Sequence, residues 1–495
     1  MPVKKLNFSL SPINDNPTTL QGGNITDGFS HKNGFPTVKF SIPAQDVLLD
    51  VSNLFLSGQM IVINPNGSGI STPDASLNAY DINNGVDSIQ RQNCINTGNW
   101  NGVASVIDKV VVQSKKTQTE LSTIINYSGY NALKMGHKNN DDDYLQSPFI
   151  RNIASGVNHG FTSRHTINAP TLADCRLTSN LQKEVGQYFS IPLDVALLQS
   201  QSIHLGNDFA GGLLLTLHLS PDSAVFHSRY RKINGGTTFA DITGVSYILK
   251  NLKLEGKYAI PSPDDLKQYN PVITMNSRVN LMNDIVSSEN SNTYTPQLQM
   301  VKGVVNTFLD DNQANNFLQN QTNFRVPCGL VEYQQGKNNI RYPYDFQTKQ
   351  VPSPQTLNMV ANNPTLPIMS RGDSELRLQF GRALLGGSLS SHTSASVRLT
   401  NDALVGDYDT DGGDDANTQR GDNTHPDLLG IGADFSNNLG QIQNFVNQDY
   451  ELKVSSGINT GRANLPQTRA SRISIQESYL RNFSQINLTN LQKVQ

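Results

Sequence analysis

The sequence predicts an all-β protein of the sandwich or jelly-roll type, organised in two β-rich halves. Three observations predict it: apolar residues recur at every second position, clusters of Gly, Asn, Asp and Pro separate these runs, and helical periodicity is rare. Because side chains of a strand point alternately to opposite faces, each alternating run predicts a half-buried strand. Many short strands joined by long polar connections are typical of sandwiches and jelly rolls.

Alternating apolar runs are clearest in the first half of the chain. In the first of them, Val38, Phe40 and Ile42 alternate with Lys39 and Ser41. Clusters such as Asn64-Pro65-Asn66-Gly67 follow the runs and predict turns and loops. The predicted strands of this half cover residues 38–42, 59–63, 105–113, 213–219 and 252–254.

One segment has the spacing of a helix. Thr117 and Glu120 are placed as in a capping box, in which the Thr oxygen accepts from the third amide while the Glu reaches back. Leu121, Ile124 and Ile125 then form one apolar stripe. The pattern predicts a short helix after the strand at 105–113, covering a sheet edge or a subunit seam.

A polar, proline-bearing stretch near Pro261-Ser262-Pro263-Asp264-Asp265 lies close to the midpoint and predicts a domain boundary. It separates a first jelly-roll-like domain, residues 36–262, from a second, residues 263–495. Residues 1–35 are predicted to be a polar N-terminal arm with little core of its own. In the second half, runs at 376–380 and 397–399 predict further strands.

The charge balance argues against a protein whose main task is to wrap nucleic acid. The 495 residues include 38 Lys and Arg against 41 Asp and Glu, a formal net charge of −3, whereas such proteins usually need a basic excess. Cys94, Cys175 and Cys328 are too few and too scattered for a disulfide framework or a zinc site. The start of the chain lacks an apolar signal region, and no stretch approaches the roughly 20 apolar residues that cross a bilayer. We therefore expect a soluble protein made in a cytosol.

Catalytic motifs are not found in the sequence. The nine His residues form no H-E-x-x-H pair, there is no G-x-S-x-G elbow, and Gly336-Lys337 lacks the other residues of a phosphate loop. We therefore predict no catalytic residues and no enzyme activity. The many loop carboxylates leave one enzymatic alternative, a β-sandwich glycan hydrolase, which would need two carboxylates roughly 5–10 Å apart in a cleft.

An acidic segment is the one candidate metal site. Asp407, Asp409 and Asp411, followed by Gly412, match the start of a calcium loop, where hard oxygens converge while Gly permits a sharp turn. Asp415 is the fourth candidate ligand. The twelfth position is Thr418 where an EF-hand has a bidentate Glu, and flanking amphipathic helices are missing. The segment is thus either a calcium loop or a solvated acidic loop, and we predict no other cofactor.

Two further short motifs have plain structural explanations. Arg371-Gly372-Asp373 is the adhesive tripeptide, but Gly and Asp before a strand also commonly form a turn. The acidic run Asp141-Asp142-Asp143 is expected to be a solvated loop tip. With the candidate calcium loop, the tripeptide supports an alternative function, a calcium-dependent adhesin or carbohydrate-binding β-sandwich protein.

A longer ordered series of segments extends through residues 36–400. Its central block consists of Tyr188–Leu193, Leu197–Leu205 and Gly211–Leu219. Val106–Val112 and Ile124–Tyr127 precede the block, and Tyr247–Leu254 closes the first half. Val301–Phe308, Asn315–Phe317 and Arg341–Phe346 follow in the second half. This series resembles the double jelly-roll major capsid proteins, with the greatest likeness to those of polinton-like viruses and virophages.

The resemblance implies both a fold and a function. The fold would be two tandem eight-stranded jelly rolls with a few short inserted helices and long loops. Three chains would place six rolls around a pseudo-sixfold axis, so that homotrimeric capsomers tile an icosahedral virus shell. The implied partners are other copies of the chain, neighbouring capsomers, penton and minor capsid proteins and, as an open question, an internal membrane, with no specific nucleic acid. The implied location is the virion, after synthesis in the host cytoplasm.

The composition agrees with this resemblance, and three features depart from it. Asn, Gln and Ser side chains suit wet, repeated interfaces, since hydrogen bonds there need little charge desolvation. The departures are His204, where the family pattern leads us to expect Pro, the acidic segment 407–415, and the Gln- and Asn-rich tail.

Overall fold

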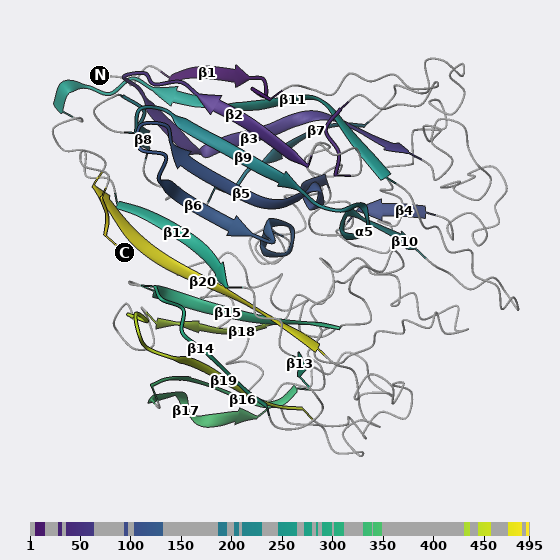
Figure 1. Cartoon of the computed structure of the whole chain (residues 1–495), viewed down its shortest axis with the longest axis vertical. Helices are drawn as coiled ribbons and strands as arrows, with labels where there is room; N and C mark the ends of the chain where they lie inside the picture. Colours follow the sequence, from purple (N-terminus) through teal and green to yellow (C-terminus); the bar gives the residue numbers. More distant parts are fainter. Residues whose placement is uncertain are drawn as a thin grey trace, which may run out of the picture.

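A computed structural model of the chain describes a mainly β protein with two sandwich units, each built on eight principal strands to which short strands are added (Figure 1). The residues that it describes are 5–14, 28–31, 36–63, 94–97, 103–131, 187–195, 202–206, 210–229, 246–264, 272–279, 284–285, 290–298, 301–310, 330–338, 340–348, 430–435, 444–456, 474–487 and 492–494.

The first unit packs two antiparallel sheets face to face. One sheet has the order β1 (Lys5–Leu10), β11 (Ser246–Ala259), β3 (Leu48–Ile63), β7 (Gln187–Pro192), and the short β8 (Ile203–His204) also pairs with β3. The other sheet has the order β2 (Thr37–Ile42), β9 (Leu213–Leu219), β5 (Ile107–Ser114), β6 (Glu120–Ile125). This interleaved order, in which the last strand of the unit lies beside the first, is that of a jelly roll.

The second unit repeats the same order. Its first sheet runs β12 (Val272–Val279), β20 (Ser474–Asn487), β15 (Val301–Asp310), β18 (Gly430–Asp434), with β13 (Asp284–Ile285) and β21 (Gln492–Val494) also on β20. Its second sheet runs β14 (Asn290–Tyr294), β19 (Tyr450–Ser456), β16 (Leu330–Lys337), β17 (Ile340–Thr348). The predicted fold class, two tandem eight-stranded jelly rolls, is confirmed.

Short elements accompany the two rolls. A two-stranded ribbon pairs β4 (Cys94–Thr97) with β10 (Phe226–Arg229), and β10 is preceded by the one-turn helix α5 (Asp222–Val225). The 3-10 helix η3 (Val103–Val106) leads into β5, and residues 127–131 form a helical turn after β6. These elements are the few short inserted helices that we expected. Among the described residues, no helix is long and apolar enough to cross a membrane.

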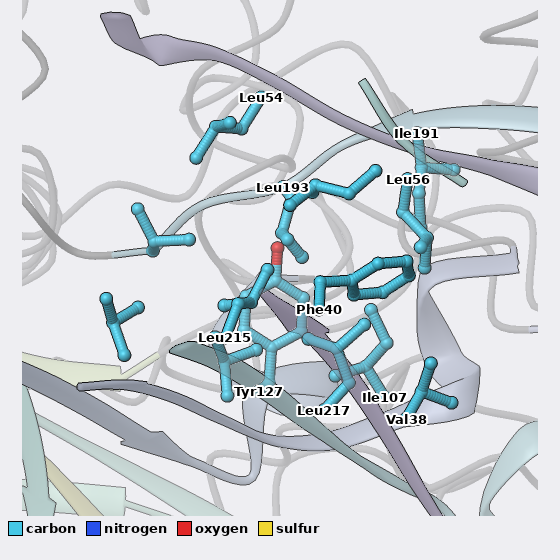
Figure 2. Close-up of a cluster of buried hydrophobic side chains, with 14 of the residues drawn as sticks. Val38, Phe40, Leu54, Leu56, Ile107, Tyr127, Ile191, Leu193, Leu215 and Leu217 are labelled. Carbon is cyan, nitrogen blue, oxygen red and sulfur yellow. The ribbon is translucent and has the colours of Figure 1, made fainter. Parts of the chain in front are cut away.

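Alternation of apolar and polar residues builds the core of the first roll. On β2, Val38 and Phe40 are fully buried while Lys39 between them is exposed, and on β9 Leu215 and Leu217 are buried on the facing positions. The apolar side chains of both sheets meet in one cluster, which includes Leu54 and Leu56 of β3 and Ile191 of β7 (Figure 2). Burial of this apolar area is the main stabilising contribution to the roll.

Both rolls place their short turns at the same end. The first strands β1 and β12 both start at the left of Figure 1, and both chain termini lie at that side. The tight connections 43–47 and 115–119 of the first roll belong to this end, and so does Asn338 after β16 of the second. The strands β3, β6, β15 and β17, which precede the long connections, end at the opposite side. We call these the short-turn end and the long-connection end.

The predicted helix over 117–125 is wrong, because this segment is a turn followed by strand β6. Ser114 donates its amide to the Thr119 carbonyl at 3.0 Å and closes a hairpin between β5 and β6, and Gln118 takes a positive φ of 58°. Glu120 does not cap a helix, since its carboxylate accepts a 2.9 Å hydrogen bond from the Thr123 hydroxyl. Pairing with the neighbouring strand β5 therefore outweighs the local helical spacing.

The N-terminal segment contributes more to the first roll than a polar arm would. Residues 5–10 form β1 in full register with β11, and Phe29 is buried and exchanges two 2.9 Å backbone hydrogen bonds with Leu249. Between the rolls, β11 ends at Ala259 and β12 begins at Val272. The predicted boundary after residue 262 falls within this connection and stays a prediction. The strands predicted at 376–380 and 397–399 lie outside the described residues.

Candidate functional site at the seam between the two rolls

The two rolls meet along a seam between one edge of the first and one face of the second. Strand β6, an edge strand of the first roll, packs beside β12, an edge strand of the second (Figure 1). The two strands belong to different sheets. The seam therefore joins the rolls by side-chain packing and leaves each sheet with its own hydrogen bonds.

Strand β15 shows how deeply the first roll covers the second. Asn306 points into the second roll, where it bonds to Tyr450 of the facing sheet. Its neighbours Val305 and Thr307 must point the other way, and yet they are only 2% and 0% exposed. Val305 belongs to the apolar cluster of the first roll. The first roll therefore packs on the outward side of β15 at Val305. We call the outward side of β12, β20, β15 and β18 the covered face.

The equivalent face of the first roll has a mixed, half-buried character. On β11, Lys253 and Lys257 point outward and are exposed, whereas Leu252 and Leu254 point into the core. On β3, Phe55 lies between the buried Leu54 and Leu56, so it points outward, and it is half-buried. We call this outward side of β1, β11, β3 and β7 the open face.

Uncharged groups occupy the middle of the open face. In register, Phe55 lies between Glu255 of β11 and Pro192 of β7, and Ser57 lies between Lys253 and Ser190. Lys253, Glu255 and Lys257 lie on β11, and Asp50 lies at the start of β3, opposite Lys257. Around Phe55 the β3–β7 side carries a proline and serines. Charge depletion around an apolar centre is typical of the middle of a protein–protein interface.

The interior of the second roll carries a chain of hydrogen bonds between buried side chains of both sheets. Ser478 Oγ donates to Asn306 Oδ1 at 2.6 Å, and Asn306 Nδ2 donates to the Tyr450 hydroxyl at 2.7 Å. The Tyr450 hydroxyl donates to Gln335 Oε1 at 2.6 Å, and Gln335 Nε2 donates to the Gly432 carbonyl at 3.0 Å. The chain links β20, β15, β19, β16 and β18, so it connects both sheets of the roll.

Burial keeps the tyrosines of these interiors neutral. The pKa of Tyr450 is raised well above its ordinary value, first by burial and then by the neighbouring Tyr294, while the Asn306 hydrogen bond acts in the opposite direction. Burial likewise raises the pKa of Tyr294, whose ring meets that of Tyr450 edge-on with centroids 5.3 Å apart. In the first roll, the hydroxyl of Tyr247 donates to the Ser220 carbonyl at 2.6 Å, and burial raises its pKa strongly as well. These hydroxyls act as hydrogen-bond donors in the core.

The short-turn end is rigidly connected in both rolls. In the first roll, Lys115 of the β5–β6 turn donates its amide to the Gly212 carbonyl at 3.1 Å. In the second roll, Asn338 of the β16–β17 turn donates its amide to the Asp449 carbonyl at 3.2 Å, and the amide of Asp449 donates back to Asn338 Oδ1 at 3.0 Å. In each roll, therefore, the turn between the last two strands of the second sheet's order is hydrogen-bonded to the segment that leads into the second strand of that order, β9 or β19.

His204, which departs from the family pattern, has a structural role at this end. It is 3% exposed, and its Nδ1 accepts a 3.1 Å hydrogen bond from the amide of Gly206. The next residue, Leu205, donates its amide to the Val47 carbonyl at 3.0 Å. The imidazole thus fixes the turn after β8, a task that a proline could not perform through an acceptor nitrogen.

The predicted metal and adhesion motifs lie outside the described residues. This applies to Asp407, Asp409, Asp411 and Asp415, to the tripeptide 371–373 and to the acidic run 141–143. In the part of the chain that the structure describes, no group of three or more His, Cys, Asp or Glu side chains could hold a metal ion. Sequence reasoning missed the Asn306–Tyr450 hydrogen bonds, and the only signal for them was a polar residue at an inward position of a valine-rich run.

Comparison with known proteins gives matches among solved structures only. No family model and no curated protein matches the sequence. The chain is similar to the crystal structure of PBCV-1 VP54 fitted into a cryo-EM reconstruction of the virophage Sputnik, with a TM-score of 0.47 and 10% identity, covering 98% of this chain and 94% of that one. It is also similar to a chain of a quasi-atomic model of the PBCV-1 virus capsid, with a TM-score of 0.44 and 9% identity, covering 97% and 94%. The major capsid protein P2 of bacteriophage PM2 matches with a TM-score of 0.29 and 8% identity, covering 97% of each chain. The two jelly rolls are defined by the strand order of this chain, independently of these matches.

Proposed function

We propose that this protein is a major capsid protein, a structural component of a virion that assembles as a homotrimer with six jelly rolls in a ring. The observation that carries the proposal is the seam: one roll of the chain already docks its β6 edge against β12 and packs on Val305 of the covered face of the other roll. The open face of the first roll corresponds to that covered face. A second copy can therefore repeat between chains the contact that the two rolls make within one chain.

The repetition follows from the shared strand order. In the two rolls, β17 takes the place of β6, and β1 takes the place of β12. Docking the β17 edge of one copy beside β1 of the next is a head-to-tail contact, and such contacts close into a ring when the rotation permits. If each roll-to-roll step turns by about 60°, as a ring of six units requires, three copies complete the ring.

The chemistry of the open face suits such a contact. Phe55, Pro192, Ser57 and Ser190 provide a centre without charges that would have to be desolvated. The lysines and Glu255 of β11 lie nearer the rim, where charges remain solvated and guide the approach of the partner. An obligate interface of this kind should bury more than about 2,000 Å².

The shared direction of the two rolls gives the ring two different ends. The short turns of every roll would lie on one side and the long connections on the other, as expected for a tile in a shell. Contacts with neighbouring capsomers and with penton and minor capsid proteins complete the proposal. The role proposed is mechanical, and it requires no catalytic residues.

The first experiment measures the mass of the purified full-length protein by light scattering. We expect roughly three times 54.3 kDa, and electron microscopy should show particles of hexagonal outline. A monomer without such particles would overturn the proposal. A trimer that dissociates on calcium chelation would instead support the calcium-dependent alternative.

A further inference from the structure

Strand β1 is an edge strand of the first roll, and it is attached to the roll mainly through its pairing with β11. It is the outermost strand of its sheet, and β11 is its only strand partner in the described sheets. Of its six residues, Lys5, Leu6, Asn7 and Ser9 are exposed, and Phe8 and Leu10 are half-buried. An edge strand of this kind is a template on which another chain can pair.

A single aromatic side chain anchors β1 to a fitted notch. Phe8 lies opposite Gly256 of β11, and its ring stacks on Tyr258 with centroids 4.2 Å apart and an interplanar angle of 17°. A Cβ atom at residue 256 would come within 2.5 Å of the Phe8 ring and 3.0 Å of Leu54. The glycine therefore leaves the space that the ring fills, which we call the Gly256 notch.

The residues after β1 are tied to the edge of the other sheet. Ile13 donates its amide to the Lys39 carbonyl at 2.8 Å. Asn14 Nδ2 donates to the Thr37 carbonyl at 2.7 Å, and its Oδ1 accepts from the Lys39 amide at 2.9 Å. Residues 5–14 thus close one side of the first roll as a unit, through β11 in one sheet and β2 in the other.

The chain leading away from this unit is long enough to reach another copy. The next anchored residue is Phe29, which is bonded to Leu249 of β11. The thirteen residues 15–27 lie between the two anchors, and at about 3.3 Å per residue they can span about 43 Å. In the proposed ring, β1 also lies at the edge that meets the neighbouring copy.

We propose that residues 5–14 are exchanged between copies, so that β1 of one chain occupies the Gly256 notch on β11 of another. Exchange of an identical element keeps every contact of the closed roll, and it therefore links subunits at little cost. The inference rests on the proposed self-association, but it goes beyond it, because a ring can form with every β1 kept in its own chain.

Cysteine pairs in the register of β1 and β11 test the exchange in the full-length protein. Ser9 lies opposite Glu255, so one chain carries Ser9→Cys and a differently tagged, co-expressed chain carries Glu255→Cys. After oxidation, mass spectrometry should find a disulfide-linked peptide that joins position 9 of one tagged chain to position 255 of the other. Neither chain alone has both introduced cysteines, so any such link lies between chains. The second pair, Asn7→Cys with Lys257→Cys, has the same register and repeats the test independently.

Two controls define the outcomes. A single chain carrying both Ser9→Cys and Glu255→Cys shows that the pair oxidises in the folded protein. Lys39→Cys and Thr216→Cys on separate chains report chance links, because this pair joins β2 and β9 in register within one roll. We expect the link between chains at positions 9 and 255 to exceed the control at least several-fold, and Phe8→Ala to reduce it. A link no greater than the control would overturn the exchange, and trimers seen by light scattering in that same sample would leave the proposed function intact.

Discussion

Asn306 donates a 2.7 Å hydrogen bond to the hydroxyl of Tyr450 across the interior of the second jelly roll. Both residues are almost fully buried, and they come from different sheets. The cluster at the centre of the first roll is mainly aliphatic, and it includes Tyr127, whose hydroxyl accepts a 3.0 Å hydrogen bond from the Asp194 amide (Figure 2). Two units of the same strand order are therefore stabilised by different interiors.

We expect Tyr450→Phe to destabilise the second roll. The change removes the hydroxyl that accepts from Asn306 and donates to Gln335, and it leaves two buried polar groups without these partners. The expected loss is about 1–3 kcal/mol in the free energy of unfolding, measured by thermal or denaturant unfolding. Tyr258→Phe is the matched control, since its ring stacks on Phe8 at the edge of the first roll. Equal losses for the two variants would contradict a role for the hydrogen-bond chain.

Stability should fall at alkaline pH. Burial raises the pKa of Tyr258 to about 12 and raises those of Tyr247 and Tyr450 well above the ordinary range. The folded protein therefore holds these protons more tightly than the unfolded chain does. The stability that this provides is complete below about pH 10, the pKa of an unfolded tyrosine, and is lost as the pH rises toward the folded values.

Unfolding midpoints measured between about pH 9 and about pH 12 check this expectation. The Tyr258→Phe variant should show a shallower decrease over that range, because one of the raised groups is gone. An unfolding midpoint that stays constant up to about pH 12 would contradict the expected loss of stability from the buried tyrosines.

Substitution on the open face should separate assembly from folding. Phe55→Asp places a carboxylate at the centre of this face, where burial against a second copy would desolvate it. We expect the variant to keep the far-ultraviolet spectrum and melting behaviour of the parent but to lose the trimer in light scattering. Leu214→Asp is the matched control, since Leu214 is half-buried and lies on the outward side of the other sheet. Trimers of unchanged stability in Phe55→Asp would exclude the open face as the interface.

Two neighbouring glycines at the short-turn end should respond differently to alanine. Gly211 and Gly212 both have positive φ, at 62° and 85°. A Cβ on Gly212 would lie 2.6 Å from the Ile42 carbonyl oxygen and 2.9 Å from the Ala44 amide nitrogen. At Gly211 it would meet one side-chain atom, the Cβ of Lys116, at 2.8 Å, and backbone atoms only at 3.4 Å. Gly212→Ala should therefore lower the free energy of unfolding by more than the roughly 1–3 kcal/mol that a strained backbone conformation alone costs. Gly211→Ala should lower it by less than Gly212→Ala does. Chemical denaturation measures both losses of stability. A larger loss for Gly211→Ala than for Gly212→Ala would contradict this explanation.

The acidic segment offers a test of the remaining metal hypothesis. If Asp407, Asp409, Asp411 and Asp415 bind calcium, titration calorimetry should show saturable binding that Asp409→Asn with Asp411→Asn abolishes. Binding that persists in this double variant would exclude the segment as the site, and the absence of binding in the parent chain would leave a solvated acidic loop.

The strand pattern was predictable because it depends on the local alternation of apolar and polar residues. The errors arose where pairing with a distant part of the chain determines the secondary structure. Val38, Phe40 and Leu215 alternate with polar neighbours, so their burial follows from the period of two. Leu121 and Ile124 fit a helix equally well, and only pairing with β5 makes them part of a strand. Lys5–Leu10 resembled a polar arm because most of its side chains face solvent, and its partner β11 lies about 250 residues away in the chain.

The candidate site was less predictable than the fold. Burial of Val305 and Thr307 comes from the other roll, and periodicity within one strand cannot indicate it. The same holds for Asn306 and Tyr450, which are brought together by the packing of two sheets, 144 residues apart in sequence.

Because β1 starts and β21 ends on the same side of the two rolls, any particle assembled as proposed would carry both of these strand ends on one surface. A reporter inserted directly before β1 or after β21 would then lie on the short-turn side, and a tag inserted directly after β3 would lie on the opposite side. Labels of two colours attached in these two ways would reveal which surface of an assembled particle each side occupies.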